Sequence, residues 1–294
     1  MTRYSESDTT KIYQAADKFR SDFLLRDGSL LFDEANLWRL DLLERIHKDF
    51  VATPDEGDRP FIVKFKDQVG QAGKEVVRLA AEILCVYFLF PSNVGGIRKR
   101  QVVNEILSWS GDNLPDNNLL SAAFAKGIGS GGQGYNTRRP FEIAFLIDLV
   151  IAWKRLPKEK QESIVADPWL FQEYADSIED AETKQLRHML VHLMFPDQFE
   201  RIASGSHKRR VIKAFSDLVM DVPENQDRAI LAIRHELEKL LPGQSLDFYW
   251  PPLVEAWFDN GESNSEGAPL EIIQHKLLAR RGRPSQSPRR PSRG

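Results

Sequence analysis

The sequence is organised around the stretch Leu84-Cys85-Val86-Tyr87-Phe88-Leu89-Phe90-Pro91, which has a later counterpart in Met189-Leu190-Val191-His192-Leu193-Met194-Phe195-Pro196. Each stretch is an apolar helix pattern that ends at Phe-Pro, because proline fixes φ and disfavours the helical conformation of the residue before it. After each, a basic cluster opens a new apolar-periodic segment. The two copies suggest two helical units related by an internal repeat, and the alternative is a coincidence between two helical hairpins.

Residues 74–90 give the strongest helix pattern in the chain, with apolar side chains on nearly all sides. A helix of that kind is normally buried at the centre of a domain. Further amphipathic segments predict helices over most of the chain, whereas residues 30–32 are expected to form a short strand or extended piece. The sequence therefore predicts a mainly α, multi-helical fold with few short strands.

The segment Leu156-Pro157-Lys158-Glu159 is a candidate domain boundary. It separates an N-terminal helical domain, residues 1–157, from a second helical unit, residues 158–258. From Asp259 onward the sequence is rich in polar residues and glycine, and it ends in an Arg/Pro/Ser-rich tail. Such compositions do not build a packed core, so we expect residues 259–294 to be a flexible linker followed by a disordered tail.

The composition is that of a globular protein without a membrane segment. Of the 294 residues, 41% are hydrophobic and 28% are charged. No apolar run is long enough to span a bilayer, and residues 1–10 lack the apolar region of a secretory signal. The single cysteine, Cys85, excludes an intrachain disulfide and is expected to be a buried, inert thiol. These features favour a cytoplasmic protein with no membrane partner.

The net charge of −3 conceals an uneven distribution of charge. Residues 280–294 contain six arginines and no acid, so removing them from the net charge leaves −9 for the rest of the chain. An acidic body argues against a domain that coats nucleic acid, because phosphate binding needs a positive field. Local basic patches remain open as contact sites.

A glycine-rich segment carries a formal G-x-G-x-x-G at Gly127, Gly129 and Gly132. A dinucleotide site would need a strand before this motif and a helix opening on its third glycine, but the next predicted helix begins only at Pro140. A flexible loop is the favoured interpretation. The alternative is a contact loop in which Asn136, Thr137, Arg138 and Arg139 touch a phosphate or an acidic partner, since a helix N-terminus attracts anions.

Other patterns do not define a catalytic, cofactor or metal site. The segment Gly70-Gln71-Ala72-Gly73-Lys74 is too short between its glycines for a Walker A motif, and Glu75 replaces the magnesium-binding hydroxyl. His188 and His192 have the spacing of a metal-binding helix but no evident third ligand, which favours structural histidines. Glu182 and Lys184 have nuclease spacing but lie at a predicted helix start. We therefore expect a chain without catalytic residues or cofactors.

Three basic clusters are candidate contact sites, although most charge runs are solvated helix faces. The functional alternative is contact with the DNA backbone or with a partner subunit. The candidate residues from these clusters and from the glycine-rich segment are Arg98, Lys99, Arg100, Asn136, Thr137, Arg138, Arg139, Lys208, Arg209 and Arg210.

Several strings together resemble the region ahead of the motor in McrB-like AAA-family ATPases, which are known or predicted components of type IV restriction and phage-defence systems. The similarity runs from about residue 15 to about residue 258. The strings are Phe90-Pro91-Ser92-Asn93-Val94-Gly95-Gly96 with Lys99-Arg100, Leu107-Ser108-Trp109-Ser110-Gly111, Asn136-Thr137-Arg138-Arg139-Pro140-Phe141, His192-Leu193-Met194-Phe195-Pro196-Asp197-Gln198-Phe199-Glu200 and Asp247-Phe248-Tyr249.

The resemblance implies an accessory module for recognition or scaffolding in a DNA-restriction system. In that family the region is followed by a AAA NTPase with Walker motifs, whereas here Trp257 precedes a polar linker and the arginine-rich tail. A partner chain would then supply the motor, or this chain is a separated or truncated version. The expected partners are DNA or a AAA NTPase or nuclease subunit. The alternatives are a protein–protein scaffold without DNA contact and an enzyme with an unrecognised site.

Overall fold

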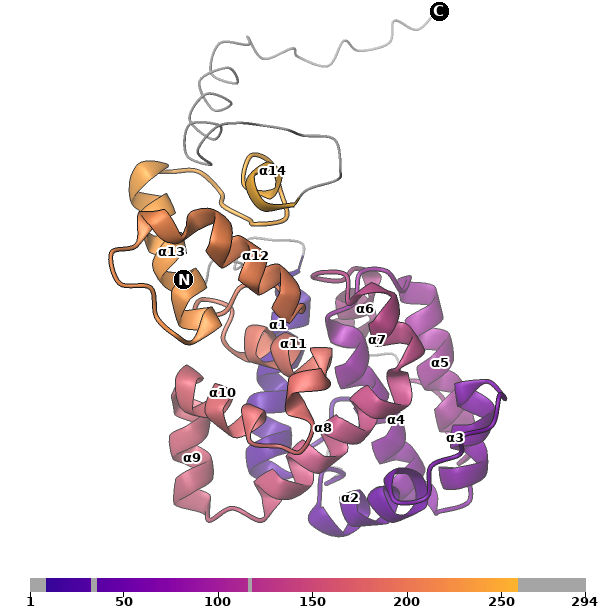
Figure 1. The fold of residues 1–294 in the computed structure, drawn as a ribbon. Helices are drawn as coiled ribbons and strands as arrows, with labels where there is room; N and C mark the ends of the chain where they lie inside the picture. The colour runs from indigo at the N-terminus through magenta and orange to yellow at the C-terminus, as the bar shows by residue number, and fades with distance from the viewer. Residues whose placement is uncertain (1–8, 33–35, 116–117, 259–294) are drawn as a thin grey trace, which may run out of the picture. The chain divides into compact units, whose positions relative to one another are not determined.

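The computed structural model describes residues 9–32, 36–115 and 118–258, and the chain divides into two compact units, Met1–Ser204 and Gly205–Gly294. Within the described ranges the protein is helical and contains no β-sheet; Pro91 and Gly129 form an isolated parallel bridge. The predicted mainly α, multi-helical fold is confirmed. Figure 1 shows the helices, and each unit is described by itself below.

The first unit contains eleven α-helices, two π-helical segments and one 3-10 turn in its described part. They are α1 (Thr10–Lys18), η1 (Phe19–Leu24), α2 (Leu40–Ile46), η2 (His47–Val51), α3 (Phe61–Val69), α4 (Lys74–Leu89), α5 (Gly96–Ser108), α6 (Asn118–Ala125), α7 (Gly132–Thr137), α8 (Arg139–Lys154), α9 (Lys158–Ala166), α10 (Pro168–Asp176), η3 (Ala181–Thr183) and α11 (Gln185–Met194).

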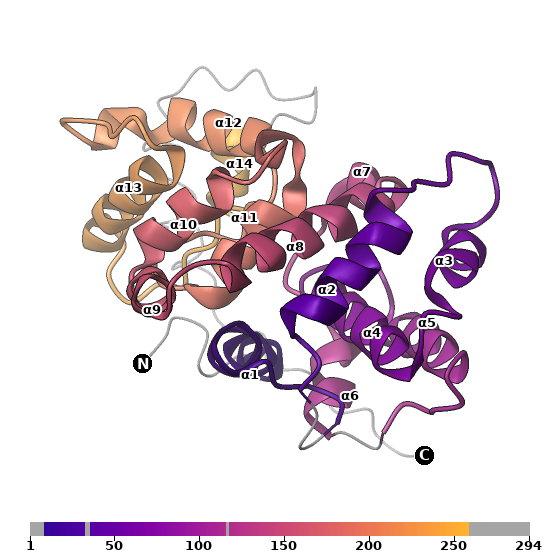
Figure 2. The same cartoon turned by 90° about the horizontal axis from the view of Figure 1, so that it is seen from below.

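Helix α4 forms the centre of the first unit. Every residue from Val76 to Leu89 is buried except Arg78, as its apolar pattern predicts. The helix packs against α1, α2, α3, α5, α6 and α8, and Figure 1 and Figure 2 show α4 among α2, α3, α5 and α8. Cys85 is buried, as the sequence predicted, and its burial raises the pKa of the thiol.

The only acid in the buried stretch of α4, Glu82, fixes the chain that follows α1 and η1. Its carboxylate accepts hydrogen bonds from the backbone N–H groups of Leu30 and Leu31 at 2.8–2.9 Å, from the Ser29 hydroxyl at 2.5 Å and from Trp38 Nε1 at 3.4 Å. These donors turn residues 29–32 inward, so the expected strand at 30–32 is absent and the backbone there forms bends.

The Phe-Pro turn after α4 lies against the glycine-rich segment. The carbonyl of Phe90 accepts from Ile128 N at 2.8 Å, and Ser92 N donates to the carbonyl of Gly129 at 2.9 Å. A Cβ at position 127 would lie 2.4 Å from the backbone of Pro91 and Ser92, so only glycine allows this approach. The predicted loop at 127–131 is thus a packed connection, and the following residues form the short helix α7 instead of continuing a loop.

The division between units falls after Ser204 and not at Pro157 as the sequence suggested. The physical reason is that α9, α10 and α11 belong to the core of the first unit: α11 packs on α1 and α8, and Trp153 of α8 stacks at an angle on Phe171 of α10. The two Phe-Pro stretches consequently do not build equivalent units. Helices α4 and α5 pack together in one unit, whereas the unit boundary separates α11 from the helix that follows it.

The second unit, in its described residues 205–258, consists of α12 (Gly205–Phe215), η4 (Ser216–Leu218), α13 (Gln226–Leu240) and α14 (Val254–Trp257). Asn225 caps α13 by accepting from the N–H groups of Asp227 and Arg228. Residues 248–253, between α13 and α14, form turns and a bend. The prediction of a flexible linker and tail falls on residues 259–294, which lie outside the described residues.

None of the helices in the described ranges combines the length and the apolarity needed to cross a bilayer.

Replacing Glu82 with glutamine should destabilise the protein by about 2–3 kcal/mol, because the amide presents donors to backbone N–H groups that need an acceptor. Denaturant unfolding of the two proteins measures the difference. Glu105→Gln, at an exposed position of α5, is the control and should change stability by less than about 0.5 kcal/mol. Equal stabilities of Glu82→Gln and the parent would contradict the anchoring role.

Candidate functional site

The two lysines predicted as contact residues, Lys99 and Lys208, are buried. Lys99 is completely buried on α5, and its ammonium donates to the carbonyl of Lys126 at 3.0 Å, with the ring of Phe124 6.0 Å away. Lys208 is also buried, and its ammonium lies 2.6 Å from a carboxylate oxygen of Asp227. The expectation that these two lysines touch DNA or a partner is corrected: their place in the apolar stripes of α5 and α12 directs them inward.

Three predicted arginines are half-buried against other parts of their own units. Arg100 donates to the carbonyl of Ser121, and Arg210 lies over the rings of Trp257 and Phe258. The guanidinium of Arg139 lies 5.5–5.7 Å from the ring centroids of Phe61, Tyr87 and Phe88. Cation–π contacts of this kind hold an arginine in place without a carboxylate.

The remaining predicted residues are more accessible. Arg98, Thr137, Arg138 and Arg209 are exposed, and Asn136 is half-buried. Arg98 stands on α5, Arg138 between α7 and α8, and Arg209 on α12 of the second unit. Of the eight basic residues predicted as contacts, three are thus exposed, and they come from three different elements.

The histidine pair on α11 is used in packing. His192 is buried; its Nδ1 lies 2.8 Å from the carbonyl of Phe199 and its Nε2 lies 2.9 Å from the Tyr13 hydroxyl. The carbonyl requires a proton on Nδ1, so the tyrosine donates to Nε2. The ring also meets Phe90 edge-on, with centroids 6.0 Å apart, which brings the two Phe-Pro stretches together. His192 is therefore the structural histidine that the sequence favoured.

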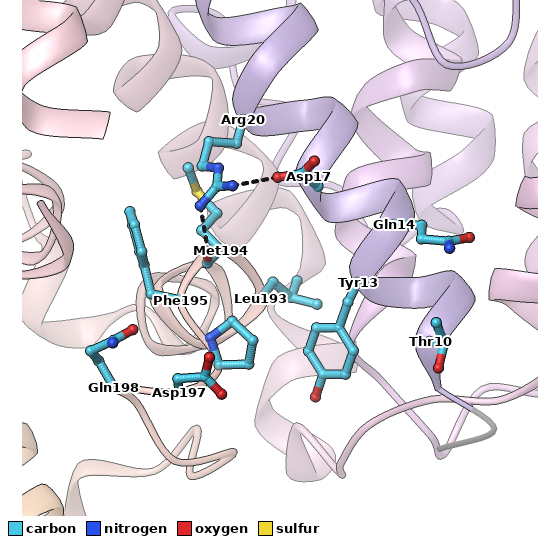
Figure 3. A pocket seen from close by; sticks show the side chains of 11 residues that line it. Thr10, Tyr13, Gln14, Asp17, Arg20, Leu193, Met194, Phe195, Asp197 and Gln198 are labelled. Carbon is cyan, nitrogen blue, oxygen red and sulfur yellow. Dashed lines mark hydrogen bonds and ion pairs between the residues drawn. The ribbon is translucent and has the colours of Figure 1, made fainter. Parts of the chain in front are cut away.

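A cavity of about 420 Å³ lies beside this network, between α1 and the residues that follow α11 (Figure 3). Of its three charged lining residues, Asp17, Arg20 and Asp197, the first two pair with each other at 2.5 Å, and Arg20 also donates to the carbonyl of Met194 at 3.2 Å. The guanidinium is thereby committed to holding α1 against the end of α11.

A second cavity, of about 620 Å³, is bordered by η2, residues 52–56, α3, the start of α8 and residues 179–184. We call it the Phe141 groove, because Phe141 lines it and is nevertheless 62% exposed. The next apolar residues along the same helix face, Phe145, Leu149 and Trp153, are buried. All four lie at successive i+4 positions, so their spacing alone does not distinguish the exposed Phe141 from the three buried residues. A partial signal was available, since Phe141 directly follows residues 136–139, which the sequence offered as part of a contact loop.

An adjoining cavity of about 610 Å³ shares Val51, Asp148 and Glu179 with the Phe141 groove. His47 Nε2 lies 3.3 Å from an Asp148 carboxylate oxygen. Burial raises the pKa of Asp148; the nearby His47 opposes that shift and Glu179 adds to it. Two carboxylates and one histidine therefore meet at the wall between the two cavities.

Ser177 also lines the adjoining cavity, so that a serine, a histidine and an aspartate share one space. They do not form a hydrolytic relay. The Ser177 hydroxyl donates to the carbonyl of Tyr174 at 2.7 Å, and it is Nε2 of His47 that faces Asp148. A base-activated serine would need its hydroxyl directed to the imidazole. The arrangement is better suited to holding a ligand than to nucleophilic catalysis.

Comparison with known proteins finds no relative: no family model, no curated protein and no solved structure matches this chain.

The burial of Lys99 predicts an unusual dependence of stability on pH. Burial lowers the pKa of Lys99 to about 8, below its ordinary value of 10.5. Between these values the unfolded chain binds more protons than the folded one, so stability rises with pH over that window, by about 3 kcal/mol in total. We would measure the free energy of unfolding of the parent and of Lys99→Met by denaturant titration from pH 7 to pH 10.5. The parent value minus the variant value should rise over this range. Lys66→Met, at an exposed position, should give a flat difference; a flat difference for Lys99→Met would contradict the expectation.

Proposed function

We propose that this chain is a non-catalytic accessory module of a McrB-like restriction or phage-defence system, and that it acts by binding a partner protein through the Phe141 groove. The observation that carries the proposal is Phe141 itself, a large aromatic side chain left 62% exposed at the rim of a cavity of about 620 Å³. What distinguishes Phe141 from other exposed apolar residues is that it lines a cavity, and residues that anchor protein interfaces cluster in pockets. The resemblance to the pre-motor region of McrB-like ATPases supplies the biological setting.

A protein partner is favoured over DNA by the state of the basic residues. Lys99 and Lys208 are buried, and Arg100, Arg139 and Arg210 are held by contacts within their own units. Phosphate binding needs several cations that reach the backbone together. The partner would be a AAA NTPase or nuclease subunit, because this chain carries no Walker motif of its own.

An enzymatic function has one supporting feature, the shared cleft of His47, Asp148 and Glu179. Its hydroxyl neighbour Ser177 is directed away, as described above, and Asp148 is already paired with His47. Binding is the simpler use of these charges.

DNA binding should be weak and without preference. We expect fluorescence anisotropy with methylated and unmethylated duplexes to show little binding at about 50 mM salt and none at about 200 mM, with no difference between the duplexes. The triple variant Arg98→Glu, Arg138→Glu, Arg209→Glu serves as the control and should behave like the parent. Tight, salt-sensitive binding that prefers one duplex and is lost in the triple variant would return the function to DNA recognition.

Association with a McrB-like AAA NTPase should depend on the groove. In co-purification of the full chain with such an NTPase, Phe141→Asp should weaken the complex by about ten-fold or more, because the anchor is replaced by a charge that must be desolvated. Ile97→Asp is the matched control: Ile97 is 68% exposed, lies on α5 and does not line the groove. The same loss for both variants, or no loss for either, would contradict a groove-mediated complex.

A further inference from the structure

The floor of the Phe141 groove is a fixed aromatic cluster. Phe50 and Phe61 line the groove, and both pack on the buried Phe65, with ring centroids 4.9 and 5.1 Å apart respectively. The guanidinium of Arg139 also packs on Phe61, 5.5 Å from the centroid of its ring. A floor whose rings are already packed loses little conformational entropy when an apolar side chain is placed on it. The groove is thus suited to a side-chain anchor.

The rim of the groove and of its adjoining cavity is acidic. Six carboxylate residues, three lysine or arginine residues and the histidine His47 line the two cavities. The acids are Glu44, Asp55, Glu56, Asp148, Glu179 and Asp180.

The three basic side chains are each committed to a neighbour. Lys64 donates to the backbone carbonyls of Asp55 and Gly57 at 2.7 and 2.8 Å. Arg155 pairs with Glu44 at 2.7 Å, and Lys184 donates to the Thr183 hydroxyl at 2.8 Å. Each of these positive charges offsets one carboxylate, so three of the six carboxylates that line the cavities are not balanced by a lysine or arginine of the lining. Arg59, outside the lining, offsets one more by pairing with Asp55 at 2.7 Å, and the rim stays acidic.

Two of the carboxylates are available to a ligand. Glu56 and Glu179 are exposed, and within the described ranges neither has an ion-pair partner. Glu179 adds to the negative potential at Asp148, where the two cavities meet. Asp148 is already paired with His47 and lies near Lys184, so the exposed Glu179 is the carboxylate at this wall that a ligand cation can pair with. A cation placed there would be attracted to Glu179 and, more weakly, to Asp148.

We infer that the occupant of the Phe141 groove is a basic peptide segment of the partner, with an apolar or aromatic anchor on the aromatic floor and a lysine or arginine at the Asp148–Glu179 wall. This inference rests on the proposed protein-binding function and specifies the chemistry of its partner. An acidic segment, or a nucleic-acid backbone, would meet like charge along this rim.

Selection from a random peptide library displayed on phage tests the inference without a known partner. The bait is the full chain, and the same library is selected in parallel against Phe141→Asp and against Ile97→Asp. We expect peptides enriched on the parent and on Ile97→Asp to combine an aromatic or aliphatic residue with lysine or arginine. These peptides should lose about ten-fold or more in affinity for Phe141→Asp.

A second variant separates charge from packing. Glu179→Lys should weaken the enriched basic peptides by roughly three- to ten-fold, and the loss should shrink at high salt. Glu105→Lys, an equally exposed acid on α5 outside the groove, should leave binding unchanged. The Tm of each variant should equal that of the parent, which would show that these exposed substitutions leave the fold intact.

The outcomes distinguish the inference from the function on which it rests. Peptides that depend on Phe141 but are acidic or uncharged would overturn the basic-partner inference and keep the groove as a protein-binding site. Absence of any peptide whose binding depends on Phe141 would overturn both. Basic peptides that bind the parent and Phe141→Asp equally would also overturn the inference, because their binding would then be nonspecific attraction to an acidic protein.

Discussion

The buried carboxylate of Glu82 is the constraint on which the first unit depends. A helix that is apolar on all sides has to be enclosed by other elements, and α4 is enclosed by six helices. A carboxylate placed inside such a core is tolerated only if donors surround it. Ser29, Leu30, Leu31 and Trp38 supply these donors, so the described residues 29–32 and Trp38 are held against α4.

Several other residues that look functional in the sequence also make structural contacts within the first unit. Gly127 allows the chain to approach the Phe90-Pro91 turn, and His192 links Tyr13, Phe90 and the carbonyl of Phe199. Arg139 fills a space among three aromatic rings instead of pairing with a carboxylate. In these three cases, a residue that suggests nucleotide, metal or phosphate chemistry in the sequence makes packing contacts between segments of the first unit.

The Phe141 groove combines apolar and acidic residues. The exposed Phe141, the packed phenylalanines beneath it and the carboxylates around it come from segments far apart in the sequence, namely η2 with the residues after it, α3, α8 and residues 179–184. An apolar floor within an acidic rim favours a protein partner over a nucleic acid, since the electrostatic field selects the sign of the ligand while the floor supplies most of the binding energy.

The sequence by itself determined the helical fold class, the central burial of α4, the burial of Cys85 and the structural role of His192. These follow from apolar periodicity and from the end of a helix at Phe-Pro, which depend only on residues within one helix. The sequence placed the start of α8 at Pro140, one residue after the observed start at Arg139, because proline is favoured in the first turn of a helix. Only the tertiary structure decided the unit boundary after Ser204, the inward direction of Lys99 and Lys208, and the groove at Phe141. These depend on which helix faces meet. A local pattern shows that a face is apolar, but whether another element covers it is settled only when distant segments pack, and at Phe141 none does.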